Sequence, residues 1–132
     1  MSPQSGATKK PPPDTAMIRV KRVYDQPTPE DGTRVLIDRL WPRGLTKDTA
    51  DLDEWCKQIA PSTSLRRWYD HQPARFQEFT DRYLLELEAP AQQAIATHLR
   101  ELAAAGPLTL LTATKDLSLS HALLLADILR RR

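Results

Sequence analysis

The sequence predicts a layered α/β domain in which helices flank a small, mainly parallel β-sheet. Three observations lead to this prediction. Strand-like segments come first, at residues 18–23 and 34–38, and helical patterns follow them. A Gly-Pro pair at 106–107 then ends a helix, and an apolar segment and a further helical pattern follow. A helix that leads into a buried strand and then into another helix is typical of an α/β sandwich.

The first half of the domain contains the two early strands. Apolar and basic residues nearly alternate over 18–23, which predicts a strand with one wet or ligand-facing side. Residues 25–32 (DQPTPEDG) are turn-forming throughout. The consecutive Val-Leu-Ile within 34–38 predicts a strand covered on both faces. We expect the polar residues 45–52 to loop outward; residues 52–59 fit a helix or a strand, and a strand is favoured.

The second half of the domain is mainly helical. Ser and Thr residues at 62–64 offer N-caps for a short helix over 65–69, and a second helix is expected to start near Pro73. Its apolar face is formed at helical spacing by Phe76, Phe79, Tyr83, Leu84 and Leu87. A third helix follows Pro90, and residues 108–113 form the clearest strand, which we expect beside 35–38. Ser118 is expected to cap the last helix.

Length and composition limit the class of protein. The chain has 132 residues, 40% of them hydrophobic and 27% charged, which fits one globular domain over 17–132. Residues 1–16, rich in proline and polar residues, are expected to form a disordered tail. The net charge of +2 is too small to indicate nucleic-acid binding by itself. A single cysteine and the lack of a long apolar run favour a cytoplasmic protein.

Residues 35–44 (VLIDRLWPRG) place charged groups where a strand ends, and ligands of open α/β folds bind at such strand ends. If 108–113 is parallel to this strand, both deliver their last residues to one edge of the sheet. We therefore predict a ligand site that contains Asp38, Arg39, Trp41, Arg43, Arg66, Thr112 and Asp116. Guanidinium groups match oxyanions, so the site is expected to take an anion. His121 and Lys115 are the candidate catalytic residues, and the cofactor is unknown.

Each of these residues also has a purely structural interpretation. Asp38 could form an ion pair with Arg39 or Arg66, Trp41 could simply pack, and His121 could hydrogen-bond a neighbouring loop. His71 and His98 are expected on the surface. Cys56 is expected to be an inert, buried thiol, although Lys57 beside it could lower its pKa. Neither a zinc-ligand spacing nor a glycine-rich phosphate loop is present in the sequence.

Four segments resemble one known family. IRVKRVYD, RVLIDRLWPRG, DEWCKQIAPS with LRRWYDH, and LLTATKD with SHALLLADIL are similar to the YeaO-like branch of the family called domain of unknown function 488, from about Met17 to Leu129. The resemblance implies a fold and marked positions, but no reaction. A related branch has a cysteine and a glutamate where Thr112 and Thr114 stand here, and a Cys-His-Arg of which only His121 is retained. Thiol chemistry is therefore not implied for this chain.

Three function classes remain open. The favoured one is a small cytoplasmic domain that binds a phosphate- or carboxylate-bearing small molecule and could act on it as an enzyme. A nucleic-acid-associated module is the alternative, with a basic face formed by Arg19, Lys21, Arg22, Arg43, Arg66 and Arg67. A non-catalytic interaction protein is the third, and it predicts no deep pocket at the sheet edge. A membrane partner is not expected, and the oligomeric state is open.

Overall fold

A computed structural model describes residues 17–131 of the chain, so the predicted tail over 1–16 lies outside the described residues. The strands are β2 (Ile18–Arg22), β3 (Thr33–Leu36), β4 (Glu54–Trp55) and β5 (Leu108–Thr112). The α-helices are α1 (Lys47–Ala50), α2 (Thr63–Tyr69), α3 (Phe76–Glu86), α4 (Pro90–Ala105) and α5 (His121–Arg130). Short 3-10 turns lie at Pro29–Asp31, Lys57–Ile59, Pro73–Arg75 and Leu117–Leu119. Within residues 17–131, no helix is both long and apolar enough to cross a membrane.

The strands form one sheet in the order β2-β5-β3-β4, and all its pairs are parallel. β5 lies in the centre, with Leu108 opposite both Ile18 and Thr33. The predicted α/β class, the parallel sheet and the pairing of 108–113 with 35–38 are thereby confirmed. Because the strands are parallel, their carboxyl ends meet at one edge.

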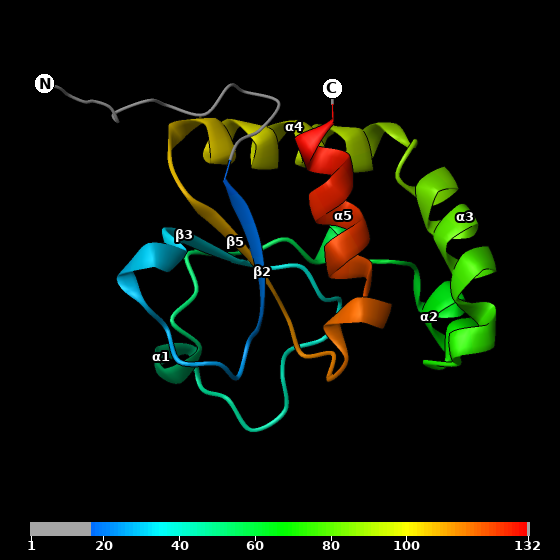
Figure 1. The fold of residues 1–132 in the computed structure, drawn as a ribbon, viewed down its shortest axis with the longest axis horizontal. Helices are drawn as coiled ribbons and strands as arrows, with labels where there is room; N and C mark the ends of the chain where they lie inside the picture. The colour runs from blue at the N-terminus through cyan, green and yellow to red at the C-terminus, as the bar shows by residue number, and fades with distance from the viewer. Residues whose placement is uncertain (1–16, 132) are drawn as a thin grey trace, which may run out of the picture.

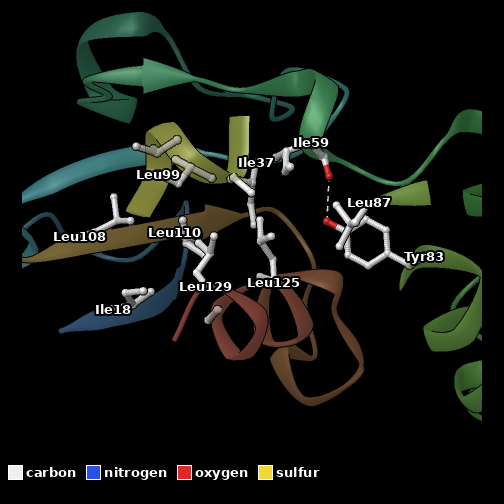
Figure 2. Close-up of a cluster of buried hydrophobic side chains, with 14 of the residues drawn as sticks. Ile18, Ile37, Ile59, Tyr83, Leu87, Leu99, Leu108, Leu110, Leu125 and Leu129 are labelled. Atoms are coloured by element: carbon white, nitrogen blue, oxygen red, sulfur yellow. Dashed lines mark hydrogen bonds between the residues drawn. The ribbon is translucent and has the colours of Figure 1, made fainter. Parts of the chain in front are cut away.

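The two faces of the sheet are covered differently. The long helices cover one face, on which Val35, Leu108 and Leu110 pack against α5 and α4 (Figures 1 and 2). Tyr83 of α3 closes this core, and its hydroxyl donates to the carbonyl of Ile59 at 2.7 Å (Figure 2). On the other face, Leu36 and Leu111 are covered by the segment between β3 and β4, which holds α1 (Figure 1).

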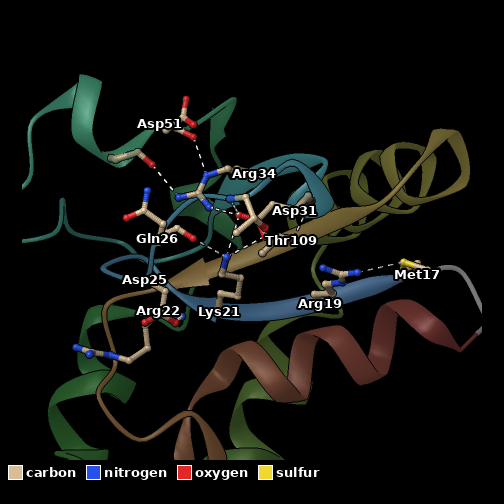
Figure 3. Close-up of polar contacts among 12 residues, drawn as sticks. Met17, Arg19, Lys21, Arg22, Asp25, Gln26, Asp31, Arg34, Asp51 and Thr109 are labelled. Atoms are coloured by element: carbon tan, nitrogen blue, oxygen red, sulfur yellow. Dashed lines mark hydrogen bonds and ion pairs between the residues drawn. The ribbon is translucent and has the colours of Figure 1, made fainter.

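A buried ion cluster stabilises this second face (Figure 3). Asp31 is fully buried and accepts hydrogen bonds from Lys21 at 2.9 Å and from Arg34 at 2.5 Å. Thr28 donates to the same carboxylate through its backbone N–H and its hydroxyl. The carbonyl of Asp31 accepts from the hydroxyl of Thr109 on β5. The turn before β3 is thereby fixed to β2 and β5.

Several boundaries differ from the prediction. β3 ends at Leu36, although the N–H of Ile37 still donates to the carbonyl of Leu111. The ambiguous segment 52–59 contains the two-residue strand β4 and a 3-10 turn, and the predicted outward loop contains α1. Ser118 does not cap the last helix, because its hydroxyl and N–H both bond Asp116; the cap position belongs to Ser120.

Candidate functional site

A cavity of about 590 Å³ lies where β3 and β5 end. The segment after β3, the segment after β5, the start of α5 and part of α2 all contribute to its lining. Eight predicted site residues line it: Asp38, Arg39, Trp41, Arg43, Arg66, Lys115, Asp116 and His121. Thr112 is fully buried beneath it. The parallel sheet therefore brings both predicted clusters to one cavity.

Asp38 connects the two strand ends. One carboxylate oxygen accepts from the hydroxyl of Thr112 and the other from the N–H of Ala113, both at 2.8 Å. The carbonyl of Asp38 accepts from the indole N–H of Trp55 at 2.7 Å. The alternative in which Asp38 pairs with Arg39 or Arg66 is wrong: within residues 17–131 no arginine forms an ion pair with Asp38, and the basic side chain that lies near its carboxylate is His121, whose Nε2 is 3.4 Å from one oxygen.

His121 is the first residue of α5 and is buried. Its Nε2 lies 2.8 Å from the carbonyl of Ile37, so this nitrogen carries the proton and donates it. Burial lowers the pKa of His121, and the nearby charge of Arg66 acts in the same direction, against the opposing effect of Asp38. We conclude that the ring is neutral near pH 7. Nδ1, which has no hydrogen bond within the described residues, is then an acceptor in a side chain that lines the cavity.

This assignment predicts a loss of stability in mild acid. The folded-state pKa of His121 lies below its unfolded value of about 6.5, so the unfolded chain takes up the proton first as the pH falls. We expect the free energy of unfolding to decrease from pH 7.5 to pH 5.5, and this decrease to be smaller in His121→Gln. Urea denaturation of both proteins measures it. An imidazole NMR signal showing His121 protonated at pH 7 would contradict the assignment.

The four basic residues of the cavity are engaged to different degrees. Arg39 donates to the carbonyls of Pro61 at 3.1 Å and of Ala60 at 2.9 Å, which anchors the segment after β3. Arg43 and Lys115 are exposed. Arg66 differs from all three, because its Nε is buried and has no hydrogen-bond partner within residues 17–131. Arg66 is therefore a donor within the site whose hydrogen bonding is incomplete.

Trp41 combines the two roles considered for it. Its indole N–H donates to the carbonyl of Leu45 at 2.7 Å. Its ring packs edge-on against the ring of Trp55, with the two ring centroids 5.3 Å apart. The side chain is nevertheless only partly buried and lines the cavity. The packing therefore fixes an aromatic ring in the lining.

Among the lining residues that were not predicted for the site are Tyr24, Tyr69 and His71, whose rings carry polar atoms. The hydroxyl of Tyr24 donates to the carbonyl of Arg43, and that of Tyr69 to the carbonyl of Leu119, both at 2.9 Å. His71 is exposed, as predicted, but lines the cavity as well. It follows Asp70, and both have positive φ, so the chain turns sharply after α2. The residue types of this turn do not predict that His71 reaches the cavity, because positive φ at two consecutive non-glycine residues follows no sequence pattern.

The remaining candidate groups lie away from this cavity. Cys56 is half-buried, and burial together with the charge of Glu54 raises its pKa to about 11, which agrees with an inert thiol. Lys57 does not lower this pKa; its ammonium lies over the Trp55 ring at 4.6 Å. His98 is exposed and contacts Glu54 at 2.8 Å. Within residues 17–131, no three His, Cys, Asp or Glu side chains converge to hold a metal ion.

Comparison with known proteins places the chain among uncharacterised relatives. The family model described as "Inactive DUF488-N3 subclade" matches residues 17–132. The uncharacterised protein Rv3073c of Mycobacterium tuberculosis is 48% identical over 115 residues, covering 87% of this chain and 95% of the relative. The uncharacterised protein YeaO of Escherichia coli is 45% identical over 113 residues, covering 86% and 96%. No solved structure matches the chain.

Proposed function

This chain belongs to the DUF488 family, in the N3 subclade described as inactive, and on that premise we propose that it binds an anionic small molecule without transforming it. The ligand would carry a phosphate or a carboxylate and would occupy the cavity at the carboxyl edge of the sheet. The cavity at this edge disagrees with the third function class, a non-catalytic interaction protein, for which no deep pocket is expected there.

The incomplete hydrogen bonding of Arg66 carries this proposal. A buried polar atom without a partner costs about 1–3 kcal/mol, so such atoms are rare. Because Nε itself is shielded, an anion would bond the outer nitrogens of the Arg66 guanidinium, which have no hydrogen-bond partner within residues 17–131 either and belong to a side chain that lines the cavity. The cavity lining also holds four basic side chains, Arg39, Arg43, Arg66 and Lys115, against two carboxylates, Asp38 and Asp116. Asp38 is already bonded by Thr112 and Ala113. The excess of positive charge favours an anion.

The start of α5 adds to this preference. The first N–H groups of a helix have no partner within the helix and carry a partial positive charge. Ser120 is at the cap position, but its hydroxyl donates to the carbonyl of Leu117 and does not cap the helix. Ser120 and His121 both line the cavity, so α5 begins at the proposed site.

We favour binding over catalysis because Thr112 stands at the position where the related branch has a cysteine. Thr112 is fully buried, and its hydroxyl donates to Asp38. Cys56 is absent from the cavity lining. Roles for His121 as an acid or base and for Lys115 beside it stay predictions. The description of the subclade as inactive agrees with a binding protein.

The experiment compares two adjacent arginines of α2. Arg66 lines the cavity, whereas Arg67 is exposed and does not line it. We expect phosphate or malonate to raise the melting temperature of the wild type and of Arg67→Gln. Arg66→Gln should weaken binding at least tenfold, because a hydrogen bond to a charged group is worth about 1.5–3 kcal/mol. Sodium chloride at matched ionic strength is the reference, and an equal shift in all three proteins would contradict the proposal.

The alternative function, a nucleic-acid-associated module with a basic face, is tested separately. Two of its six basic residues are engaged within the fold, since Lys21 bonds Asp31 and the Nε of Arg22 donates to the carbonyl of Thr114. Binding to duplex DNA that falls steeply with salt would favour this alternative.

A further inference from the structure

The cavity is larger than a simple anion requires. Small-molecule sites have volumes of roughly 300–1,000 Å³, and the 590 Å³ here lies well within that range. A water molecule in the liquid takes up only about 30 Å³, and inorganic phosphate has five non-hydrogen atoms. A phosphate held by Arg66 and Lys115 would therefore leave most of the cavity to an organic group.

The charge of the lining selects among anions. The four basic and two acidic side chains leave two positive charges in excess. A phosphate monoester carries a charge of about −1.5 to −2 at pH 7, whereas a single carboxylate carries −1. A phosphate monoester therefore neutralises the cavity more completely.

Two aromatic side chains offer fixed ring surface to that organic group. Tyr24 is 41% exposed, and Trp41 is partly exposed. Their polar hydrogens already form hydrogen bonds within the protein. The Tyr24 hydroxyl donates to the carbonyl of Arg43, and the Trp41 indole N–H donates to the carbonyl of Leu45. The guanidinium of Arg22 lies over one face of the Tyr24 ring, 5.2 Å from its centroid, so Tyr24 offers a ligand its other face. Trp41 offers the ring surface that its edge-on contact with Trp55 leaves free. Such surface favours stacking with a flat ring, for which every nucleobase is suited.

Acceptors for hydroxyl groups lie in the same lining. The carboxylate of Asp38 accepts one hydrogen bond on each oxygen from Thr112 and Ala113, which leaves further lone pairs on both. Its side chain is 16% exposed. Nδ1 of the neutral His121 is a second acceptor. Sugar hydroxyls are donors that these groups can accept.

From these three sets of groups we infer that the ligand is a nucleoside monophosphate. Its phosphate contacts Arg66 and Lys115, its sugar hydroxyls donate to Asp38 and His121, and its base stacks against Tyr24 and Trp41. This inference rests on the proposed anion site and names the class of molecule that fills it.

The test distinguishes the contribution of the base to the binding affinity from that of the phosphate. Affinities for inorganic phosphate, ribose 5-phosphate, adenosine 5′-monophosphate and uridine 5′-monophosphate are measured by titration calorimetry on the full chain. We expect the better of the two nucleotides to bind about 5- to 150-fold more tightly than ribose 5-phosphate, because stacking one base on an aromatic ring contributes that much. Tyr24→Leu should remove most of this gain and leave the affinity for ribose 5-phosphate unchanged. Tyr24→Phe keeps the ring but loses the hydroxyl that donates to the carbonyl of Arg43, so it should keep more of the gain than Tyr24→Leu does.

Three other outcomes would each overturn the inference. Nucleotides that bind no more tightly than ribose 5-phosphate overturn the inference but leave the anion site standing. The same holds if Tyr24→Leu, folded by circular dichroism, weakens binding of ribose 5-phosphate as much as binding of the nucleotide. If none of the four molecules binds, the inference fails, and so does the proposal that the cavity takes a phosphate-bearing ligand.

Discussion

Replacing Asp31 by asparagine is expected to lower the free energy of unfolding by about 3–5 kcal/mol. The carboxylate is fully buried between Lys21 and Arg34, and the side chain of Arg34 is itself only 4% exposed. Removing the negative charge leaves the guanidinium buried without a counter-charge. Urea denaturation measures the loss, and Asp127→Asn is the matched control because its ion pair with Arg131 is exposed. The control should change stability by less than about 1 kcal/mol.

The same substitution should change the pH dependence of stability. Burial of Asp31 opposes its ionisation, but hydrogen bonds from Lys21, Thr28 and Arg34 outweigh this effect and hold its pKa far below the usual range. The stability that it contributes is therefore complete above the unfolded pKa of about 3.9 and is lost as the pH falls below that value. We expect the wild type to lose more stability than Asp31→Asn between pH 5 and pH 2.5. Parallel curves for the two proteins would show that the ion cluster does not stabilise the fold.

Asp38→Ala is expected to lower the free energy of unfolding by about 2–4 kcal/mol. The substitution removes the acceptor for the Thr112 hydroxyl and for the Ala113 N–H, and a buried donor left without a partner costs about 1–3 kcal/mol. The connection between the ends of β3 and β5 is lost with it. Chemical denaturation measures the change.

Asp116→Ala is the control for Asp38→Ala. Asp116 lines the same cavity, but it is exposed, and within residues 17–131 its carboxylate accepts hydrogen bonds from Ser118 alone, two residues away. We expect its loss to cost about 1 kcal/mol, as for a local cap. Equal losses in the two variants would mean that Asp38 acts locally and does not connect the strands.

The fold could be predicted because each element has local signals. Gly106 and Pro107 mark the boundary before β5, and the apolar residues of β5 are all buried. The start of α5 could not be placed in the same way, because Ser118 and Ser120 are equally good caps by type. Asp116 decides between them by taking both donors of Ser118. Such a choice depends on one side-chain rotamer and not on a pattern.

The sequence predicts only the part of the site that follows from the parallel pairing of β3 with β5. Once β3 and β5 are neighbours, Asp38 and Lys115 must approach the same edge. The contribution of Tyr24 depends on how the turn after β2 folds back over Arg43, and no residue pattern reports this. The ion cluster was missed for a similar reason. Asp31 stands in a turn-forming segment, and its partner Lys21 is ten residues away on strand β2.

The central place of β5 has a consequence for the synthesis of this protein on the ribosome. β2 and β3 are made early, yet neither pairs with the other; both pair with β5, whose Leu108 lies opposite Ile18. The nascent chain therefore holds β2 without a partner, and β3 with only the two-residue strand β4 beside it, until nearly the whole domain has been translated. Contacts between residues so distant in sequence also slow folding. During translation, the charged side chains that alternate along β2 separate its apolar residues and reduce the risk of aggregation.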